Sequence, residues 1–192
     1  MGYDNDLIRK GLADRSAMFQ KLSLDRTFIR GVQELIATVL SSLQSGGTVL
    51  VCGNGGSASQ AQHLAGEIVG RFKMERRGLP AIALTADSSI LTAIGNDYGF
   101  ENIFARQVEA YSAPNNMVLG ITTSGNSGNV LRALESARRA GMHAACLTGR
   151  DGGSARSICP VMLVAPYFDT AMIQEVHEAV IHLVAGAIDE NG

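Results

Sequence analysis

Short, almost continuously apolar segments alternate with helical patterns along most of this chain, and this alternation is the strongest constraint on its fold. Five of these segments are expected to be strands, near residues 48–52, 81–84, 117–121, 144–147 and 161–164. Helical patterns predict helices near residues 57–72, 89–96, 103–112, 127–140 and 170–188. Strands that are apolar on both faces belong to sheets covered by helices on both sides. The order predicts an α/β fold, a three-layer αβα sandwich with a five-stranded parallel sheet.

The first 46 residues carry a different pattern. Apolar positions recur at helical spacing from Leu7 to Leu22 and again from Phe28 to Leu43, which predicts two amphipathic helices ahead of the first strand. Covering one small sheet does not require both helices, so the surplus apolar surface indicates packing against a second subunit. We expect a single domain over residues 1–192, with an N-terminal helical extension (1–46) in an oligomer interface and an αβα core (47–192).

Composition and charge exclude several classes of protein. The formal net charge is −2, which argues against nucleic-acid binding. A local basic cluster follows the helix predicted at 57–72, and it is either a positive patch or a solvated helix end: Arg71, Lys73, Arg76 and Arg77. The polar N-terminus carries no signal segment, and no run reaches the ~18 apolar residues that span a bilayer. We therefore expect a cytoplasmic protein without a membrane partner.

The three cysteines do not form a disulfide framework, because their number is odd and their spacing wide. Cys52 and Cys146 fall within apolar strand-like segments, where cysteine usually serves as a small core residue. We expect both to be buried core side chains.

A glycine-rich loop, Gly53-Asn54-Gly55-Gly56-Ser57, follows the first predicted strand and opens a helix. Ligands in such sheets bind at the carboxyl ends of strands. Glycines allow positive φ angles and close approach of a ligand, and Ser57 is expected to be the helix N-cap. The loop matches neither common nucleotide-binding motif. A tight turn needs only one glycine, so three glycines around an asparagine favour a ligand-binding loop.

A second loop, Thr122-Thr123-Ser124-Gly125-Asn126-Ser127, follows the third predicted strand. A helix begins at Ser127 or Gly128, so free backbone N–H groups and the positive end of the helix dipole meet four hydroxyl side chains. These donors suit a phosphate monoester, although the loop contains no lysine or arginine. A serine-rich capping turn is the simpler interpretation, and the number of hydroxyls favours phosphate binding.

Candidate acid–base groups lie on two of the predicted helices. His63 and Glu67 are four residues apart and share one helix face. On the last helix, Gln174 lies near His177 and about 80° around the axis from His182, so spacing does not choose between the two histidines. Such groups suit general acid–base chemistry, and this donor set also suits Zn²⁺. The simpler interpretations are a surface contact for His63 and Glu67 and a core role for His182.

Five phrases then occur in order along the chain: Gly53-Asn54-Gly55-Gly56-Ser57, Pro80-Ala81-Ile82-Ala83-Leu84, Ala93-Ile94-Gly95-Asn96-Asp97-Tyr98-Gly99-Phe100, Thr123-Ser124-Gly125-Asn126-Ser127 and Ile173-Gln174-Glu175. Together they resemble the sedoheptulose 7-phosphate isomerases (phosphoheptose isomerases) of the SIS, or sugar isomerase, fold. The resemblance implies a flavodoxin-like αβα fold, a homotetramer and conversion of sedoheptulose 7-phosphate to D-glycero-D-manno-heptose 7-phosphate. That reaction begins the synthesis of nucleotide-activated heptoses for lipopolysaccharide or other surface glycans.

The resemblance also assigns roles to residues of this chain. It implies that Glu67 is the catalytic base and His182 its acid–base partner. In zinc-bearing members one ion per subunit is held at positions that match His63, Glu67, Gln174 and His182. The substrate-binding positions match Asn54, Gly55, Gly56, Ser57, Glu67, Arg71, Asn96, Asp97, Thr122, Thr123, Ser124, Ser127, Asp169 and Gln174. Thr122 stands where some members have serine, which keeps the hydroxyl group.

Three alternative functions remain at this point. One is a non-enzymatic SIS protein that binds a replication initiator, and another is a phosphosugar sensor. Both are disfavoured by the presence of Glu67 and His182, which binding alone does not need. The third alternative is an isomerase of another phosphosugar, and such enzymes usually carry additional domains.

Overall fold

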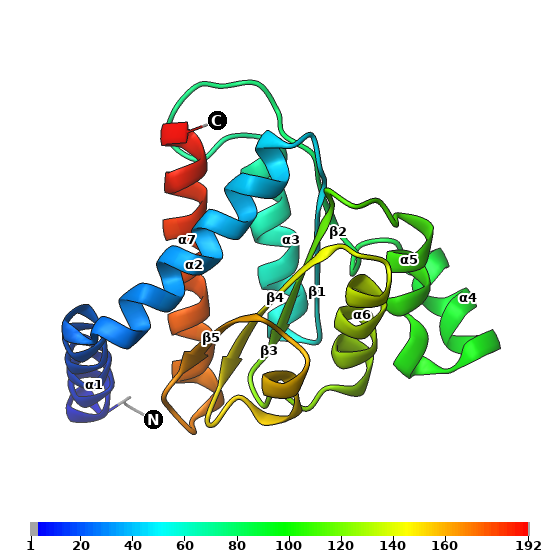
Figure 1. Ribbon diagram of the computed structural model, residues 1–192. Helices are drawn as coiled ribbons and strands as arrows, with labels where there is room; N and C mark the ends of the chain where they lie inside the picture. The colour runs from blue at the N-terminus through cyan, green and yellow to red at the C-terminus, as the bar shows by residue number, and fades with distance from the viewer. Residues whose placement is uncertain (1–3, 192) are drawn as a thin grey trace.

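A five-stranded parallel sheet forms the centre of the protein, seen here in a computed structural model that describes residues 4–191 (Figure 1). Its strands are β1 (Val49–Gly53), β2 (Ala81–Ala83), β3 (Met117–Thr122), β4 (His143–Gly149) and β5 (Val161–Ala165). They lie in the order β2-β1-β3-β4-β5, and every neighbouring pair is parallel. This is the flavodoxin-like order, and it confirms the predicted fold class.

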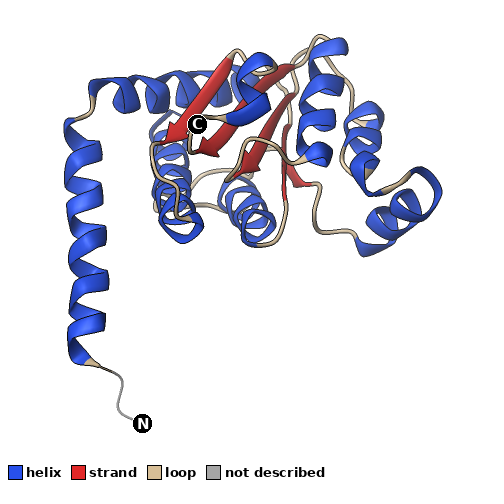
Figure 2. Cartoon of the chain, turned by 90° about the horizontal axis from the view of Figure 1, so that it is seen from below, coloured by secondary structure: helices blue, strands red, loops and turns tan. Residues whose placement is uncertain are grey.

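Helices cover both faces of the sheet (Figure 2). One core cluster joins the sheet to α2 (Arg26–Gln44), α3 (Gly56–Val69) and α7 (Thr170–Asn191). The second cluster lies on the opposite face, with α4 (Ser88–Tyr98), α5 (Ala105–Ala110) and α6 (Gly128–Arg139). Two short 3₁₀ helices, η1 (Phe100–Asn102) and η2 (Gly153–Ser157), complete the connections.

Successive side chains of β1 lie in opposite core clusters, as expected for a strand that is covered on both faces. Val49 and Val51 belong to the cluster with α2, α3 and α7, whereas Leu50 and Cys52 belong to the other. All three cysteines are buried and free within the described chain, which confirms the core role predicted for Cys52 and Cys146.

The start of α3 differs from the prediction. The N-cap is Gly55, whose φ of 56° suits glycine, and the helix begins at Gly56. Ser57 is therefore inside the first turn and buried, so its prediction as the N-cap was wrong. The helix also ends at Val69 instead of residue 72, because residues 70–80 form a loop that contacts the end of α7.

The first helix, α1 (Asn5–Leu24), projects away from the rest of the protein (Figure 2). Met18 and Leu22 are buried against the body, and Arg15 Nε pairs with Glu175 Oε1 of α7 at 2.7 Å. The remaining apolar side chains of α1 are largely exposed, among them Leu7, Leu12 and Leu24. The surplus apolar surface expected from the sequence is therefore present.

An apolar groove of about 390 Å³ lies where α1, α2 and α7 meet. Its walls include Phe19, Phe28, Ile29, Val180 and Leu183. Ile29 and Leu183 are both exposed.

Helix α7 is the one helix among residues 4–191 that is long and apolar enough, by length and composition, to cross a membrane. Its most apolar window has a mean hydropathy of 1.2 and is 44% buried inside the fold. The core helix of a globular domain meets the same criterion, so this feature alone is weak support for a membrane span.

Gly120 sets how closely α6 packs on β3. A Cβ at this position would lie 2.7 Å from Val130 Cγ1 and 3.0 Å from Leu134 Cδ1. We expect Gly120→Val to lower the free energy of unfolding by about 1–3 kcal/mol, because overpacking forces side chains out of favourable rotamers. Urea denaturation measures the change.

Gly66→Ala is the matched control, because a Cβ at that helical site meets open space among the described residues. It should stabilise the protein by roughly 0.5–1 kcal/mol, since alanine favours helix more than glycine. Equal stability of Gly120→Val and the wild type would contradict the packing argument.

Candidate active site

The two loops singled out in the sequence meet at the carboxyl ends of β1 and β3, which are neighbours in the sheet. Asn54 of the first loop and Asn129 of α6 exchange two hydrogen bonds. Asn54 Nδ2 donates to Asn129 Oδ1 at 2.9 Å, and Asn129 Nδ2 donates to Asn54 Oδ1 at 2.8 Å. This amide pair ties the loops together at the topological switch point of the sheet, where such folds bind ligands. Sequence reasoning missed Asn129, although it lies in the first turn after the hydroxyl-rich loop.

The second loop presents donors at the start of α6. Ser127 is the N-cap of α6, but its hydroxyl lies 2.9 Å from Thr122 Oγ1 and does not cap the helix. Val130 N donates to Asn129 Oδ1 at 2.9 Å, so the first-turn N–H groups left for another acceptor are those of Gly128 and Asn129. An uncapped helix N-terminus beside hydroxyl groups suits a phosphate, so this geometry agrees with the predicted phosphate loop (residues 122–127).

The turn after β4 holds the phosphate loop in place. Gly125 has a φ of 67°, and a Cβ there would lie 2.1 Å from Gly152 O, so only glycine fits. Ala155 N donates to Gly125 O at 3.0 Å. Asn126 Oδ1 accepts hydrogen bonds from both the backbone N and the hydroxyl of Ser154, at 2.9 and 2.8 Å. The loop is thus preorganised by contacts outside itself.

A cluster of histidines and carboxylates lies between α3 and α7. His63 Nε2 is 3.0 Å from Glu67 Oε1, and His63 Nδ1 is hydrogen-bonded to Glu178 Oε1. The ring of His182 meets that of His63 edge to face, with centroids 5.1 Å apart. Ligand atoms of His63, Glu178 and His182 all lie within 4.8 Å of one another, which makes these residues a possible metal-binding triad.

Glu178 was not among the residues predicted from the sequence. It lies four residues after Gln174 and four before His182, so all three share one stripe of α7. This four-residue spacing on α7 is the sequence signal that could have identified Glu178.

The donor set of this cluster fits a zinc ion. Imidazole nitrogen and carboxylate oxygen are both zinc ligands, and two ligands of one tetrahedral zinc lie about 3.3 Å apart. The 3.0 Å between His63 Nε2 and Glu67 Oε1 is close to that value. Gln174 is more remote: a Cβ at Gly56 would lie 2.5 Å from Gln174 Nε2, so this amide faces the first loop.

His177 has a structural role. It is only 1% exposed, and its Nε2 is hydrogen-bonded to Thr148 O at 2.9 Å. Burial lowers the pKa of His177 to about 4, against the opposing effect of that hydrogen bond. The imidazole is therefore neutral near pH 7, and His182, which the spacing could not distinguish from it, is the histidine beside His63.

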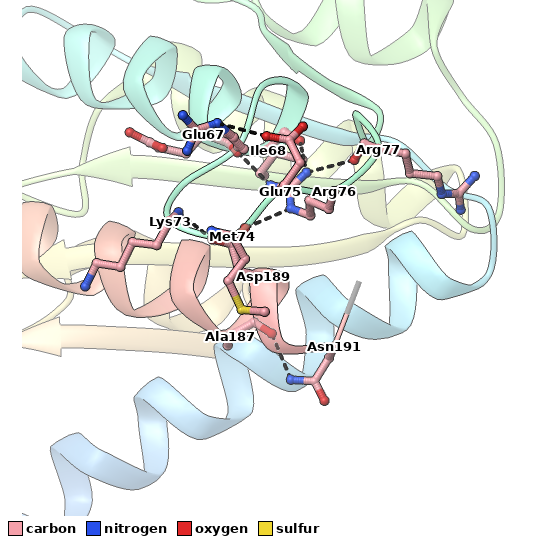
Figure 3. Close-up of polar contacts among 11 residues, drawn as sticks. Glu67, Ile68, Lys73, Met74, Glu75, Arg76, Arg77, Ala187, Asp189 and Asn191 are labelled. Carbon is pink, nitrogen blue, oxygen red and sulfur yellow. Dashed lines mark hydrogen bonds and ion pairs between the residues drawn. The ribbon is translucent and has the colours of Figure 1, made fainter.

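The loop of residues 70–80 brings an aromatic ring to the cluster. Phe72 stacks on His182 with centroids 5.4 Å apart. Asp189 of α7 anchors this loop by accepting hydrogen bonds from Lys73 N, Met74 N and Arg76 Nε, at 2.6, 2.8 and 2.9 Å (Figure 3).

Arg76 corrects one interpretation made from the sequence. Its side chain is 7% exposed and that of Asp189 is 2% exposed, so Arg76 belongs neither to a surface patch nor to a solvated helix end. The guanidinium also donates to Glu67 O and Ile68 O, at 2.7 and 2.9 Å, and so satisfies the last carbonyls of α3 (Figure 3).

Four further predicted residues, Arg71, Asn96, Asp97 and Asp169, make polar contacts outside the cluster. Arg71 is exposed and pairs with Glu75 at 3.5 Å. Asn96 Nδ2 donates to Asp97 Oδ1 on α4, which packs on the opposite face of the sheet from α3 and α7. Asp169 Oδ1 accepts from Met172 N at the start of α7. One chain therefore does not bring Asn96 and Asp97 to Glu67.

Comparisons with known proteins agree with this fold. A family model described as the SIS domain matches residues 22–149, a range that contains β1 to β4. The fold and this match define the chain as a SIS-domain protein. Among curated proteins, the phosphoheptose isomerase of Trichlorobacter lovleyi is 52% identical over 183 residues, covering 95% of this chain and 92% of that relative.

Solved structures give the same result. The phosphoheptose isomerase of Neisseria gonorrhoeae is 39% identical with a TM-score of 0.89, covering 96% of this chain and 98% of the other. That of Francisella tularensis is 37% identical with a TM-score of 0.90, covering 96% and 97%. The chain belongs to the phosphoheptose isomerase family, which confirms the resemblance found in its motifs.

The buried pair of Arg76 and Asp189 should be important for stability. We expect Asp189→Asn to lower the free energy of unfolding by about 3–5 kcal/mol, because it leaves a buried guanidinium without a counter-charge. Glu109→Gln, in the exposed pair with Arg106, is the control and should cost less than about 1 kcal/mol. Chemical denaturation measures both.

The stabilisation by Asp189 should also depend on pH. Burial opposes ionisation, but the hydrogen bonds from Met74 N, Lys73 N and Arg76 outweigh it and lower the pKa of Asp189 from 3.8 to about 2. The unfolded chain takes up the proton first, so the stabilisation is complete above about pH 4 and is lost between pH 4 and 2. A constant difference between wild type and Asp189→Asn across that range would contradict this assignment.

Proposed function

We propose that this protein is an aldose–ketose isomerase that converts sedoheptulose 7-phosphate to D-glycero-D-manno-heptose 7-phosphate, the first step of nucleotide-activated heptose synthesis. One observation carries the proposal. A chain 52% identical to a phosphoheptose isomerase retains a preorganised loop for a phosphate together with a Glu–His cluster for proton transfer.

In this proposal the phosphate loop binds the 7-phosphate. The hydroxyls of Thr122, Thr123, Ser124 and Ser127 and the N-terminus of α6 supply neutral donors. The first loop, with Asn54, lies beside the phosphate loop through the amide pair with Asn129 and contacts the sugar hydroxyls. Binding at the phosphate end then supplies energy that orients the reacting carbons.

Proton transfer is assigned to Glu67 and His182. Glu67 takes the proton from C1 of the open-chain ketose, which gives an enediol, and returns a proton at C2. His182 moves the hydroxyl proton between O1 and O2. His63 supports the assignment of Glu67, because its Nε2 lies 3.0 Å from the carboxylate and fixes the position of that group. Phe72 supports that of His182 by stacking on its ring.

The same cluster is proposed to bind one zinc ion per subunit through His63, Glu67, Gln174 and His182. When bound, the ion would polarise the substrate carbonyl. Gln174 faces the first loop and lies eight positions, or about 12 Å of helix rise, before His182, so its amide would have to turn toward the cluster to join the other three ligands.

We further propose a cytoplasmic homotetramer. The exposed apolar side chains of α1 and the groove between α1, α2 and α7 are surfaces that a second copy would cover. The position of Glu67 also supports sharing of the site between copies. It lies eleven residues, or about 16 Å of helix rise, beyond Gly56 and the carboxyl edge of the sheet.

Proton NMR with sedoheptulose 7-phosphate in D₂O, with and without Zn²⁺, tests the reaction. The wild type should produce an aldose anomeric signal with deuterium at C2. Glu67→Gln should keep substrate binding, measured by calorimetry, but lose at least a factor of ~10² in turnover, because the carboxylate that accepts the proton is gone. Near-normal turnover in this variant would eliminate Glu67 as the base, and a folded wild type without turnover would refute the isomerase assignment.

The oligomer is tested by light scattering coupled to size-exclusion chromatography. The wild type should have the mass of four chains. Ile29→Glu places a charge in the apolar groove and should shift the mass to a smaller species, because burying an unpaired charge is costly. Gln44→Glu, on an exposed part of α2, is the control and should leave the mass unchanged.

A further inference from the structure

We propose that Glu178 is a positioning residue for the metal centre. Its carboxylate accepts a hydrogen bond from Nδ1–H of His63 and so directs Nε2 of that ring to the cation. The inference rests on the proposed zinc site and names a residue outside the ligand set proposed above. Its distinguishing feature is that both nitrogens of His63 meet a carboxylate, Glu178 at Nδ1 and Glu67 at Nε2.

The location of Glu178 follows from the packing of two helical stripes. On α3, Gln60, His63 and Glu67 follow one another at spacings of three and four residues and share a face. On α7, Glu178 and His182 are four residues apart and face this stripe. The carboxylate of Glu178 thus reaches the side of the imidazole that is remote from Glu67.

The two carboxylates leave the Nε2 side of His63 for a cation. A histidine that binds a metal is neutral, so it carries one N–H and donates to one acceptor only. With its proton on Nδ1, directed to Glu178, the Nε2 lone pair and the Glu67 carboxylate face each other at 3.0 Å with no proton between them. A divalent cation bound by both groups satisfies both, and the result is a carboxylate–histidine–metal arrangement.

Glu178 is itself held in place. Gln60 Nε2 donates to Glu178 Oε2 at 3.2 Å and to Gln174 O at 2.7 Å. Gln60 is only 7% exposed, so this amide links α3 to α7 from the interior. The carboxylate is therefore fixed by two partners, His63 and Gln60, as an orienting group requires.

Zinc affinity, measured by competition with a chromogenic chelator, tests the proposal without reference to turnover. Glu178→Gln should weaken zinc binding 10–100-fold, the usual effect of losing a carboxylate behind a ligating histidine. Glu175→Gln is the matched control: it removes the same charge from the same helix at a side chain of similar exposure, 34% against 36%, that pairs with Arg15. It should change zinc affinity less than twofold.

Two spectroscopic measurements separate positioning from a purely structural role or from direct ligation. ¹⁵N NMR of the zinc-bound protein should place the His63 proton on Nδ1 in the wild type. The visible spectrum of the Co²⁺ form should keep its shape in Glu178→Gln if the ligands are unchanged. Zinc affinity within threefold of wild type, a proton on Nε2, or a Co²⁺ spectrum that shows a lost ligand would each overturn the proposal.

These outcomes are distinguishable from failure of the proposed function. Absence of sedoheptulose 7-phosphate turnover in the wild type refutes the isomerase assignment and leaves the zinc measurements valid. If the wild type turns over substrate but binds no zinc, the isomerase assignment stands and the proposed role of Glu178 is refuted.

Discussion

The packing of α3 against α7 is the contact on which the candidate site depends. Helix α3 follows the first strand of the chain, β1, and α7 follows the last, β5, yet both helices pack on the same face of the sheet. Their apolar sides enter one core, and the polar stripes between them bring Glu67 and His63 to Glu178 and His182. Changes to this packing would alter the geometry of every acid–base group at once.

The phosphate loop and the Glu–His cluster are stabilised by different means. The loop owes its shape to neutral hydrogen bonds with the turn after β4 and to a glycine for which no other residue substitutes. The cluster depends on charged groups, and the buried pair of Arg76 and Asp189 holds the loop whose phenyl ring stacks on His182. The phosphate loop is therefore held by neutral contacts, whereas the loop beside the cluster is held by a buried ion pair.

The proposed assembly of several copies would explain both the exposed apolar surface and the separation of the predicted site residues. Helix α1 buries only part of its apolar side chains on its own chain. Asn96 and Asp97 lie on the face of the sheet opposite to Glu67. A single chain therefore leaves apolar side chains exposed and keeps Asn96 and Asp97 apart from Glu67.

The sequence by itself determined the layers of the fold, the two loops at the carboxyl ends of β1 and β3 and the family, because hydrophobic period and loop composition are local properties. It did not determine that Gly55 caps α3, which depends on a φ of 56° in a tight turn. Only the tertiary structure showed that His177 is a buried core residue, that Arg76 is paired inside the protein and that Glu178 stands behind His63. Each of these depends on contacts between segments distant in sequence, and spacing within one helix does not show which strand, loop or helix packs against it.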